Sequence, residues 1–135
     1  MIDKKADILV VEDSPVQAEL LRRTLSRNGY EVRIARNGEE GLASIARKKP
    51  DLVISDIEMP TMNGYEMCSR IKNDEKTSGI PILVLTSFAS PEDVIHGLYA
   101  KVDNYLTKPY EEGYLLQRIR SEEHTSELPS RQSIS

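Results

Sequence analysis

The sequence has few cysteines and histidines and no long apolar runs, and each shortage excludes a class of protein. Its one cysteine, Cys68, cannot form an internal disulfide and suits a reducing cytosol. Its two histidines, His96 and His124, lie too far apart in the sequence to give a metal-binding spacing. Its apolar stretches are much shorter than the roughly 20 residues that a membrane-spanning helix needs.

The charge balance bears on the binding partners and the location of the protein. With 18 basic and 22 acidic residues the chain has a net charge of -4, which argues against direct nucleic-acid binding through many phosphate contacts. Residues 1–5 are charged and no apolar region of signal length follows, so we expect no signal peptide, no membrane partner and a cytoplasmic location. A chain of 135 residues with 39% apolar residues suits one globular domain.

Short apolar runs alternate with helical patterns along the chain. The runs predict buried strands at residues 7–11, 30–35, 51–56, 80–85 and 104–107. Cap and turn residues predict helix starts at Ser14-Pro15, at Asn37-Gly38, after Gly64, at Ser90-Pro91 and near Glu111. This alternation predicts an α/β fold, in which helices cover both faces of a parallel sheet. Right-handed crossovers favour the strand order 2-1-3-4-5.

Polar residues follow four of the five predicted strands. Glu12-Asp13 follows the first strand, Asp56 ends the third, Thr86 follows the fourth and Lys108 follows the fifth. In an open parallel sheet the carboxyl ends of the strands form the edge where ligands bind. We therefore expect these side chains to converge on one site.

The predicted cluster has the chemistry of a magnesium-assisted phosphoryl site. Three neighbouring carboxylates repel one another unless a cation is present, and a site of oxygen ligands alone suits Mg²⁺. Lys108 and Thr86 add a cation and a hydroxyl that can hold a phosphoryl group. A carboxylate such as Asp56 can itself act as the nucleophile and form an acyl phosphate.

Taken together, these motifs resemble the receiver domain of bacterial two-component response regulators. The resemblance covers about residues 6–120 and rests on Glu12-Asp13, Asp56 with Met59-Pro60 and Gly64, Thr86-Ser87, Tyr105, and Lys108-Pro109. It implies a flavodoxin-like (βα)5 three-layer sandwich. It also implies signal transduction by phosphorelay, with a sensor histidine kinase or a phosphotransfer protein as the partner.

The resemblance implies roles for the acidic residues. Asp56 is the expected phosphoacceptor, which attacks a phosphohistidine of the partner. Asp13 is expected to ligate Mg²⁺ directly and Glu12 to do so through water, while the backbone carbonyl of Glu58 supplies a further ligand. We expect self-catalysed phosphotransfer and autodephosphorylation, and no enzymatic activity on a separate substrate.

The resemblance also implies a switch. Thr86 and Lys108 are expected to bind the phosphoryl oxygens, and the peptide bond between Lys108 and Pro109 is expected to be cis. As Thr86 moves, Tyr105 would swing inward and change the surface formed by the fourth helix, fifth strand and fifth helix. The output that this surface controls is not encoded in these motifs.

Some of these residues also have simpler interpretations. Glu12 and Asp13 alone would suit a solvated loop, and Tyr105 alone would suit packing in a strand. The alternative function is a phosphorylation-independent interaction module, a pseudo-receiver. An aspartate-nucleophile phosphatase is disfavoured, because it needs a second aspartate two residues after the nucleophile, where this chain has Glu58.

The carboxyl-terminal segment differs from the rest. Helical periodicity ends at Arg120, so we expect a receiver domain over residues 1–120 with a truncated last helix. Residues 121–135 are predicted to be a polar tail that is either disordered or the translation of a sequencing adapter, which its first residues resemble.

Overall fold

Five parallel strands and four helices make up the part of the chain that the computed structural model describes, residues 6–57, 64–86 and 102–127. The strands are β1 (Asp7–Val11), β2 (Glu31–Ala35), β3 (Leu52–Asp56), β4 (Ile82–Thr86) and β5 (Asn104–Thr107). The helices are α1 (Pro15–Arg27), α2 (Gly38–Arg47), α3 (Gly64–Lys72) and α5 (Glu112–Glu127). The strand order is β2-β1-β3-β4-β5, as predicted.

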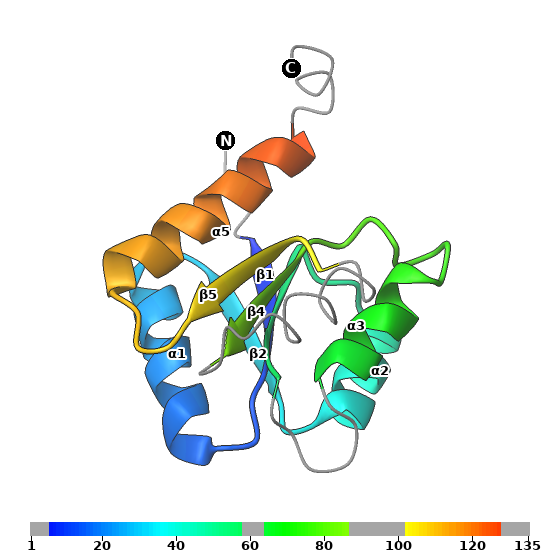
Figure 1. Ribbon diagram of the computed structural model, residues 1–135, viewed down its shortest axis with the longest axis horizontal. Coiled ribbons are helices and arrows are strands. Elements are labelled where there is room, and N and C mark those ends of the chain that lie inside the picture. Colours follow the sequence, from blue (N-terminus) through cyan, green and yellow to red (C-terminus); the bar gives the residue numbers. More distant parts are fainter. Residues whose placement is uncertain (1–5, 58–63, 87–101, 128–135) are drawn as a thin grey trace.

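Two hydrophobic cores fill the spaces between the sheet and its helices (Figure 1). α1 and α5 cover one face, where Leu21, Leu25, Leu115 and Ile119 pack against β1, β3 and β4. α2 and α3 cover the other face, where the buried residues include Ile45, Met67, Cys68, Ile71, Val53 and Val84. The predicted three-layer α/β sandwich is therefore confirmed.

The predicted helix caps fix where the helices begin and end. The Ser14 hydroxyl accepts a hydrogen bond from the Gln17 amide at 3.3 Å, and the Asn37 side chain accepts one from the Glu40 amide at 2.8 Å. Gly29 follows α1 with a φ of 91°, a left-handed conformation that glycine adopts without a steric penalty. Local sequence thus sets the entry and exit of α1 and the entry of α2.

α5 differs from the predicted end of the last helix. It continues through Glu127, whereas its apolar pattern ends at Ile119. The residues after Arg120 contain no proline or glycine before Pro129, so nothing in their backbone chemistry stops the helix at residue 120. The origin of residues 121–135 stays a prediction, and the predicted helix that begins at Ser90-Pro91 lies outside the described residues.

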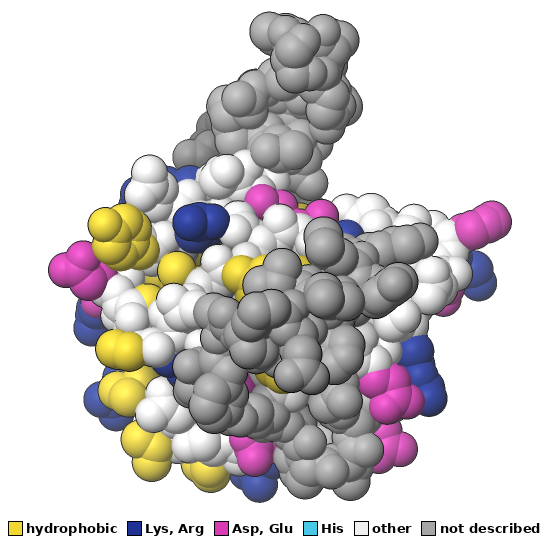
Figure 2. Space-filling view, in the orientation of Figure 1, with side chains coloured by type: hydrophobic (Ala, Val, Ile, Leu, Met, Phe, Trp, Pro, Cys, Tyr) yellow, Lys and Arg dark blue, Asp and Glu magenta, His cyan; other side chains and the backbone are white. Residues whose placement is uncertain are grey.

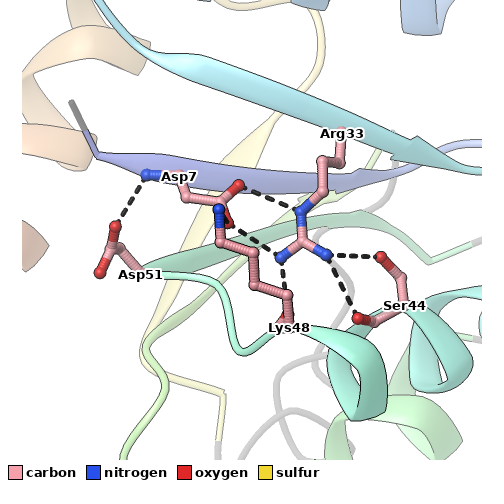
Figure 3. Close-up of polar contacts among 5 residues, drawn as sticks. All are labelled: Asp7, Arg33, Ser44, Lys48 and Asp51. Atoms are coloured by element: carbon pink, nitrogen blue, oxygen red, sulfur yellow. Dashed lines mark hydrogen bonds and ion pairs between the residues drawn. The ribbon is translucent and has the colours of Figure 1, made fainter.

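The amino-terminal edge of the sheet is closed by a charged network (Figure 3). Asp7 begins β1 and is buried, and its carboxylate contacts the Arg33 guanidinium at 3.0 and 3.1 Å. Arg33 also donates to the Ser44 hydroxyl at 2.9 Å and to the Lys48 carbonyl at 2.8 Å, at the end of α2. The Asp7 amide donates to Asp51 at 2.7 Å, so the network joins β1, β2, α2 and the residue before β3.

Within the described residues, none of the helices combines the length and apolar character needed to cross a lipid bilayer.

Candidate phosphoryl and metal site

The sheet register brings the two acidic strand ends together. β1 lies beside β3, with Val11 opposite Ser55, so Glu12 and Asp56 follow at neighbouring positions of the carboxyl edge. The Glu12 amide donates to the Ala35 carbonyl at 2.9 Å, which extends the strand pairing of β1 by one residue. The strand order places these residues at the switch point, where the chain turns to opposite sides of the sheet.

Three carboxylates form one cluster at this edge. Oxygen atoms of Glu12, Asp13 and Asp56 all lie within 4.8 Å of one another. Glu12 and Asp56 are buried, with 3% and 8% of their surface exposed, whereas Asp13 is exposed. A set of oxygen ligands with one open side matches the coordination of Mg²⁺, which retains several waters. The residues present therefore suit this ion.

Lys108, the residue after β5, contacts the cluster. Its ammonium lies 3.4 Å from Asp56 Oδ2 and 3.9 Å from Glu12 Oε1. The Lys108 amide donates to the Thr86 carbonyl at 2.8 Å, which fixes the lysine to the end of β4. The peptide bond between Lys108 and Pro109 is cis, as predicted. Among the described residues, Lys108 is the cation that forms ion pairs with this cluster.

Burial and the neighbouring Asp56 charge both favour the neutral form of Glu12. The pKa of Glu12 is raised from 4.5 to about 7, mainly because the side chain is buried and also because the Asp56 charge lies close to it. The Ser14 amide, which donates to Glu12 at 3.2 Å, and the Lys108 charge lower this pKa, but they do not offset burial. A nearby divalent cation would favour the ionised form of this carboxylate.

Gly64 supports the backbone of the site. Its amide donates to the Ile57 carbonyl at 3.0 Å. A Cβ atom at this position would lie 2.6 Å from the Asp56 carbonyl oxygen, a distance that real Cβ atoms do not reach. The start of α3 therefore packs directly on the end of β3, and only glycine permits this approach.

Thr86 and Tyr105 lie where the sequence predicted. Thr86 ends β4 and is 2% exposed, and it pairs in register with Thr107. Tyr105 is partly buried beside β4, with Val84 as its register partner. Its hydroxyl lies 2.9 Å from that of Tyr65, a contact that the sequence patterns did not predict. Helical spacing offered a signal for it, because Tyr65 lies three residues before the buried Cys68.

One predicted site residue, Glu58, lies outside the described residues. Five of the others lie at the carboxyl edge of the sheet: Glu12, Asp13, Asp56, Thr86 and Lys108. Tyr105 lies two residues before the end of β5.

Comparison with known proteins agrees with this geometry. The family model described as response regulator receiver domain matches residues 8–120. Protein PilH of Pseudomonas aeruginosa is 37% identical over 116 residues, which cover 86% of this chain and 96% of PilH. The DNA-binding dual master transcriptional regulator RpaA of Synechocystis is 36% identical over 114 residues, or 84% of this chain and 47% of RpaA. The chain thus spans about half the length of several curated relatives that it matches.

Solved structures show the same fold. The chemotaxis protein CheY4 of Vibrio cholerae superposes with a TM-score of 0.83 at 33% identity, over 87% of this chain and 98% of that one. A response regulator structure from Chloroflexus aurantiacus gives a TM-score of 0.85 at 36% identity, over 90% and 99% of the two chains.

Proposed function

Because the chain belongs to the response regulator receiver family of two-component signalling, we propose that it accepts a phosphoryl group on Asp56 from a phosphohistidine of a sensor kinase or phosphotransfer protein. The observation that carries this proposal is the contact of one ammonium with the carboxylate cluster, at 3.4 Å from Asp56 and 3.9 Å from Glu12. These groups lie at the edge of the sheet where ligands of such folds bind.

The proposed transfer is a displacement at phosphorus. A carboxylate oxygen of Asp56 forms the new O–P bond, while the P–N bond to the donor imidazole breaks and its electron pair returns to the ring nitrogen, which takes a proton. Lys108 balances negative charge on the phosphoryl oxygens. Hydrolysis of the acyl phosphate by water later restores Asp56, so the chain acts on itself and not on a separate substrate.

Glu12, Asp13 and Asp56 would hold the divalent cation, with the Glu58 carbonyl as a further expected ligand. When bound, Mg²⁺ supplies positive charge that stabilises a phosphoryl group during transfer. The residues themselves set the selectivity, because oxygen ligands without histidine or thiolate favour a hard cation.

Thr86 and Tyr105 are proposed to couple binding of the phosphoryl group to a conformational change at the surface. Thr86 would bind a phosphoryl oxygen, and the ring of Tyr105 on the neighbouring strand would follow its movement. The surface proposed to change is that of the fourth helix, β5 and α5, of which β5 and α5 are described. The phosphoryl group thus shifts the population of two arrangements of one surface.

An apolar face beside the site suits the docking of the phosphoryl donor. On α1, Val16 and Leu20 are 67% and 53% exposed, although both are apolar. Figure 2 shows hydrophobic side chains along the left edge of this view, over α1. A groove of about 500 Å³ between α1 and the start of α5 reaches Lys108 and Pro109. A helical donor domain that buries this face would bring its phosphohistidine to Asp56.

We propose that this transfer takes place in the cytoplasm, because the single cysteine suits a reducing compartment.

Intact-mass measurement tests this function. The full chain is incubated with acetyl phosphate, with and without Mg²⁺, and the mass gain of one phosphoryl group is expected only with the ion. Asp56→Asn should abolish the gain. Lys108→Ala should retain some labelling but uncouple it from the surface change. A wild-type chain that gains no mass would leave the phosphorylation-independent interaction module as the better description.

A further inference from the structure

A hydroxyl pair links α3 to β5 and is not used by the proposed transfer. The Tyr65 and Tyr105 hydroxyl oxygens lie 2.9 Å apart, a hydrogen-bond distance in which either group can donate. Both rings are partly buried and pack against the core on the α2 and α3 face of the sheet. The rings are therefore held by packing, and the hydroxyl contact fixes how they lie relative to each other.

Tyr65 is coupled mechanically to the phosphoacceptor strand. It directly follows Gly64, whose amide bonds to the Ile57 carbonyl at 3.0 Å. Gly64 also packs so closely on the Asp56 carbonyl that a methyl group would not fit. A displacement at the end of β3 must therefore move the start of α3, and the Tyr65 ring with it.

Tyr105 is placed to receive movement from the neighbouring strand as well. It pairs in register with Val84, while Thr107 pairs with Thr86. Because side chains two residues apart point to the same face of a sheet, Tyr105 and Thr86 lie on one face of adjacent strands. Tyr105 thus lies between two connections to the phosphoryl site, one through β4 and one through Tyr65.

We propose that Tyr65 is a positioning residue, whose hydroxyl holds the Tyr105 ring in the arrangement that the structure shows. This role deepens the proposed function and rests on it for its consequence in signalling. The contact stabilises this arrangement relative to any arrangement in which the two hydroxyls separate. Its removal shifts that equilibrium by about two- to tenfold, the effect of one net hydrogen bond.

The first test uses the unphosphorylated full chain and the variant Tyr65→Phe, which keeps the ring and removes the hydroxyl. Relaxation-dispersion NMR of ¹³C-labelled tyrosine rings measures the population of the minor Tyr105 conformer, with the signal assigned by Tyr105→Phe. We expect that population to rise about two- to tenfold in Tyr65→Phe. Tyr114→Phe is the matched control, because Tyr114 is 57% exposed on α5 and should leave the signal unchanged. An unchanged Tyr105 signal in Tyr65→Phe overturns the positioning role.

The second test measures the rate at which acetyl phosphate and Mg²⁺ label Asp56. The labelling rate of Tyr65→Phe should differ from that of the wild type by a similar factor, and Tyr65→Phe/Tyr105→Phe should match Tyr105→Phe alone. Wild-type rates in Tyr65→Phe, or independent effects that multiply in the double variant, contradict the coupling. If the wild type itself takes up no phosphoryl group, the proposed function fails, and the dispersion measurement still decides whether Tyr65 positions Tyr105.

Discussion

The two edges of the sheet differ in how many cations lie beside their buried carboxylates. At the amino-terminal edge, Asp7 contacts the Arg33 guanidinium at 3.0 Å and has the Lys48 ammonium at 3.7 Å. At the carboxyl edge, three carboxylates share one contacting ammonium among the described residues, that of Lys108. The first arrangement has two cations beside one carboxylate, whereas the second has one ammonium beside three carboxylates and a surplus of negative charge that a further cation would balance. This difference distinguishes a structural ion pair from a candidate site on the same sheet.

The largest effect is expected from breaking the balanced edge. Arg33→Met leaves Asp7 buried without its guanidinium and removes the hydrogen bonds to Ser44 and Lys48. We expect a loss of about 3 kcal/mol of unfolding free energy, near the lower end for a buried pair because Arg33 is 26% exposed. Urea denaturation of the full chain measures the loss.

A double variant separates the charge effect from lost packing. Asp7→Val/Arg33→Met removes both charges, so it should recover most of the stability that Arg33→Met loses. If the double variant is as unstable as Arg33→Met, the loss comes from the guanidinium contacts to α2 and not from an unpaired Asp7.

Removal of a charge at the carboxyl edge should increase the unfolding free energy, whereas Arg33→Met decreases it. Glu12 is 3% exposed and its pKa is raised to about 7, so its ionised form is costly in the folded, metal-free chain. Glu12→Gln should therefore stabilise the metal-free protein by about 2 kcal/mol at pH 8. A destabilisation at pH 8 would show that the two edges are balanced alike.

The same carboxylate predicts how stability depends on pH. The unfolded chain has the ordinary pKa of 4.5 for Glu12 and the folded chain has about 7, so the folded state binds the proton more tightly. The contribution of Glu12 is thus most favourable below 4.5, falls as the pH rises to about 7, and is constant above that. Subtracting the unfolding free energies of Glu12→Gln from those of the wild type at several pH values isolates this slope.

Added Mg²⁺ tests whether the ion binds at Glu12. At pH 8 the ion should stabilise the wild type more than Glu12→Gln, because it favours the ionised carboxylate. An equal gain in both proteins would place the ion away from Glu12. The Arg33→Met loss should be unaffected by the ion, since Asp7 begins β1 and the carboxylate cluster follows its other end.

The smallest effect is expected from Lys48→Ala. The Lys48 side chain is 67% exposed and its ammonium is 3.7 Å from Asp7, so solvent screens the pair. Its carbonyl, which accepts from Arg33, is retained in the variant. We expect a change within about 0.5 kcal/mol by urea denaturation. A loss as large as that of Arg33→Met would mean that Lys48 is as important a counter-charge of Asp7 as Arg33.

Local sequence signals predicted most of the fold because they depend on neighbouring residues. Ser14, Asn37 and Gly29 act through nearby backbone groups, and apolar runs determined the strands. The site was predictable because strand ends in a parallel sheet share one edge, so Glu12 and Asp56 could be placed together without coordinates. Contacts between distant side chains were not predictable. The Tyr65–Tyr105 pair spans 40 positions and depends on where the start of α3 lies relative to β5.

The most direct test of the proposed phosphorylation is to locate the acyl phosphate chemically. The chain is treated with acetyl phosphate and Mg²⁺, reduced with borohydride, which converts an acyl phosphate to an alcohol, and analysed by peptide mass mapping. We predict reduction at Asp56 alone, dependent on Mg²⁺ and absent in Asp56→Asn. Reduction at another carboxylate, or none in the folded wild type, would contradict the proposal.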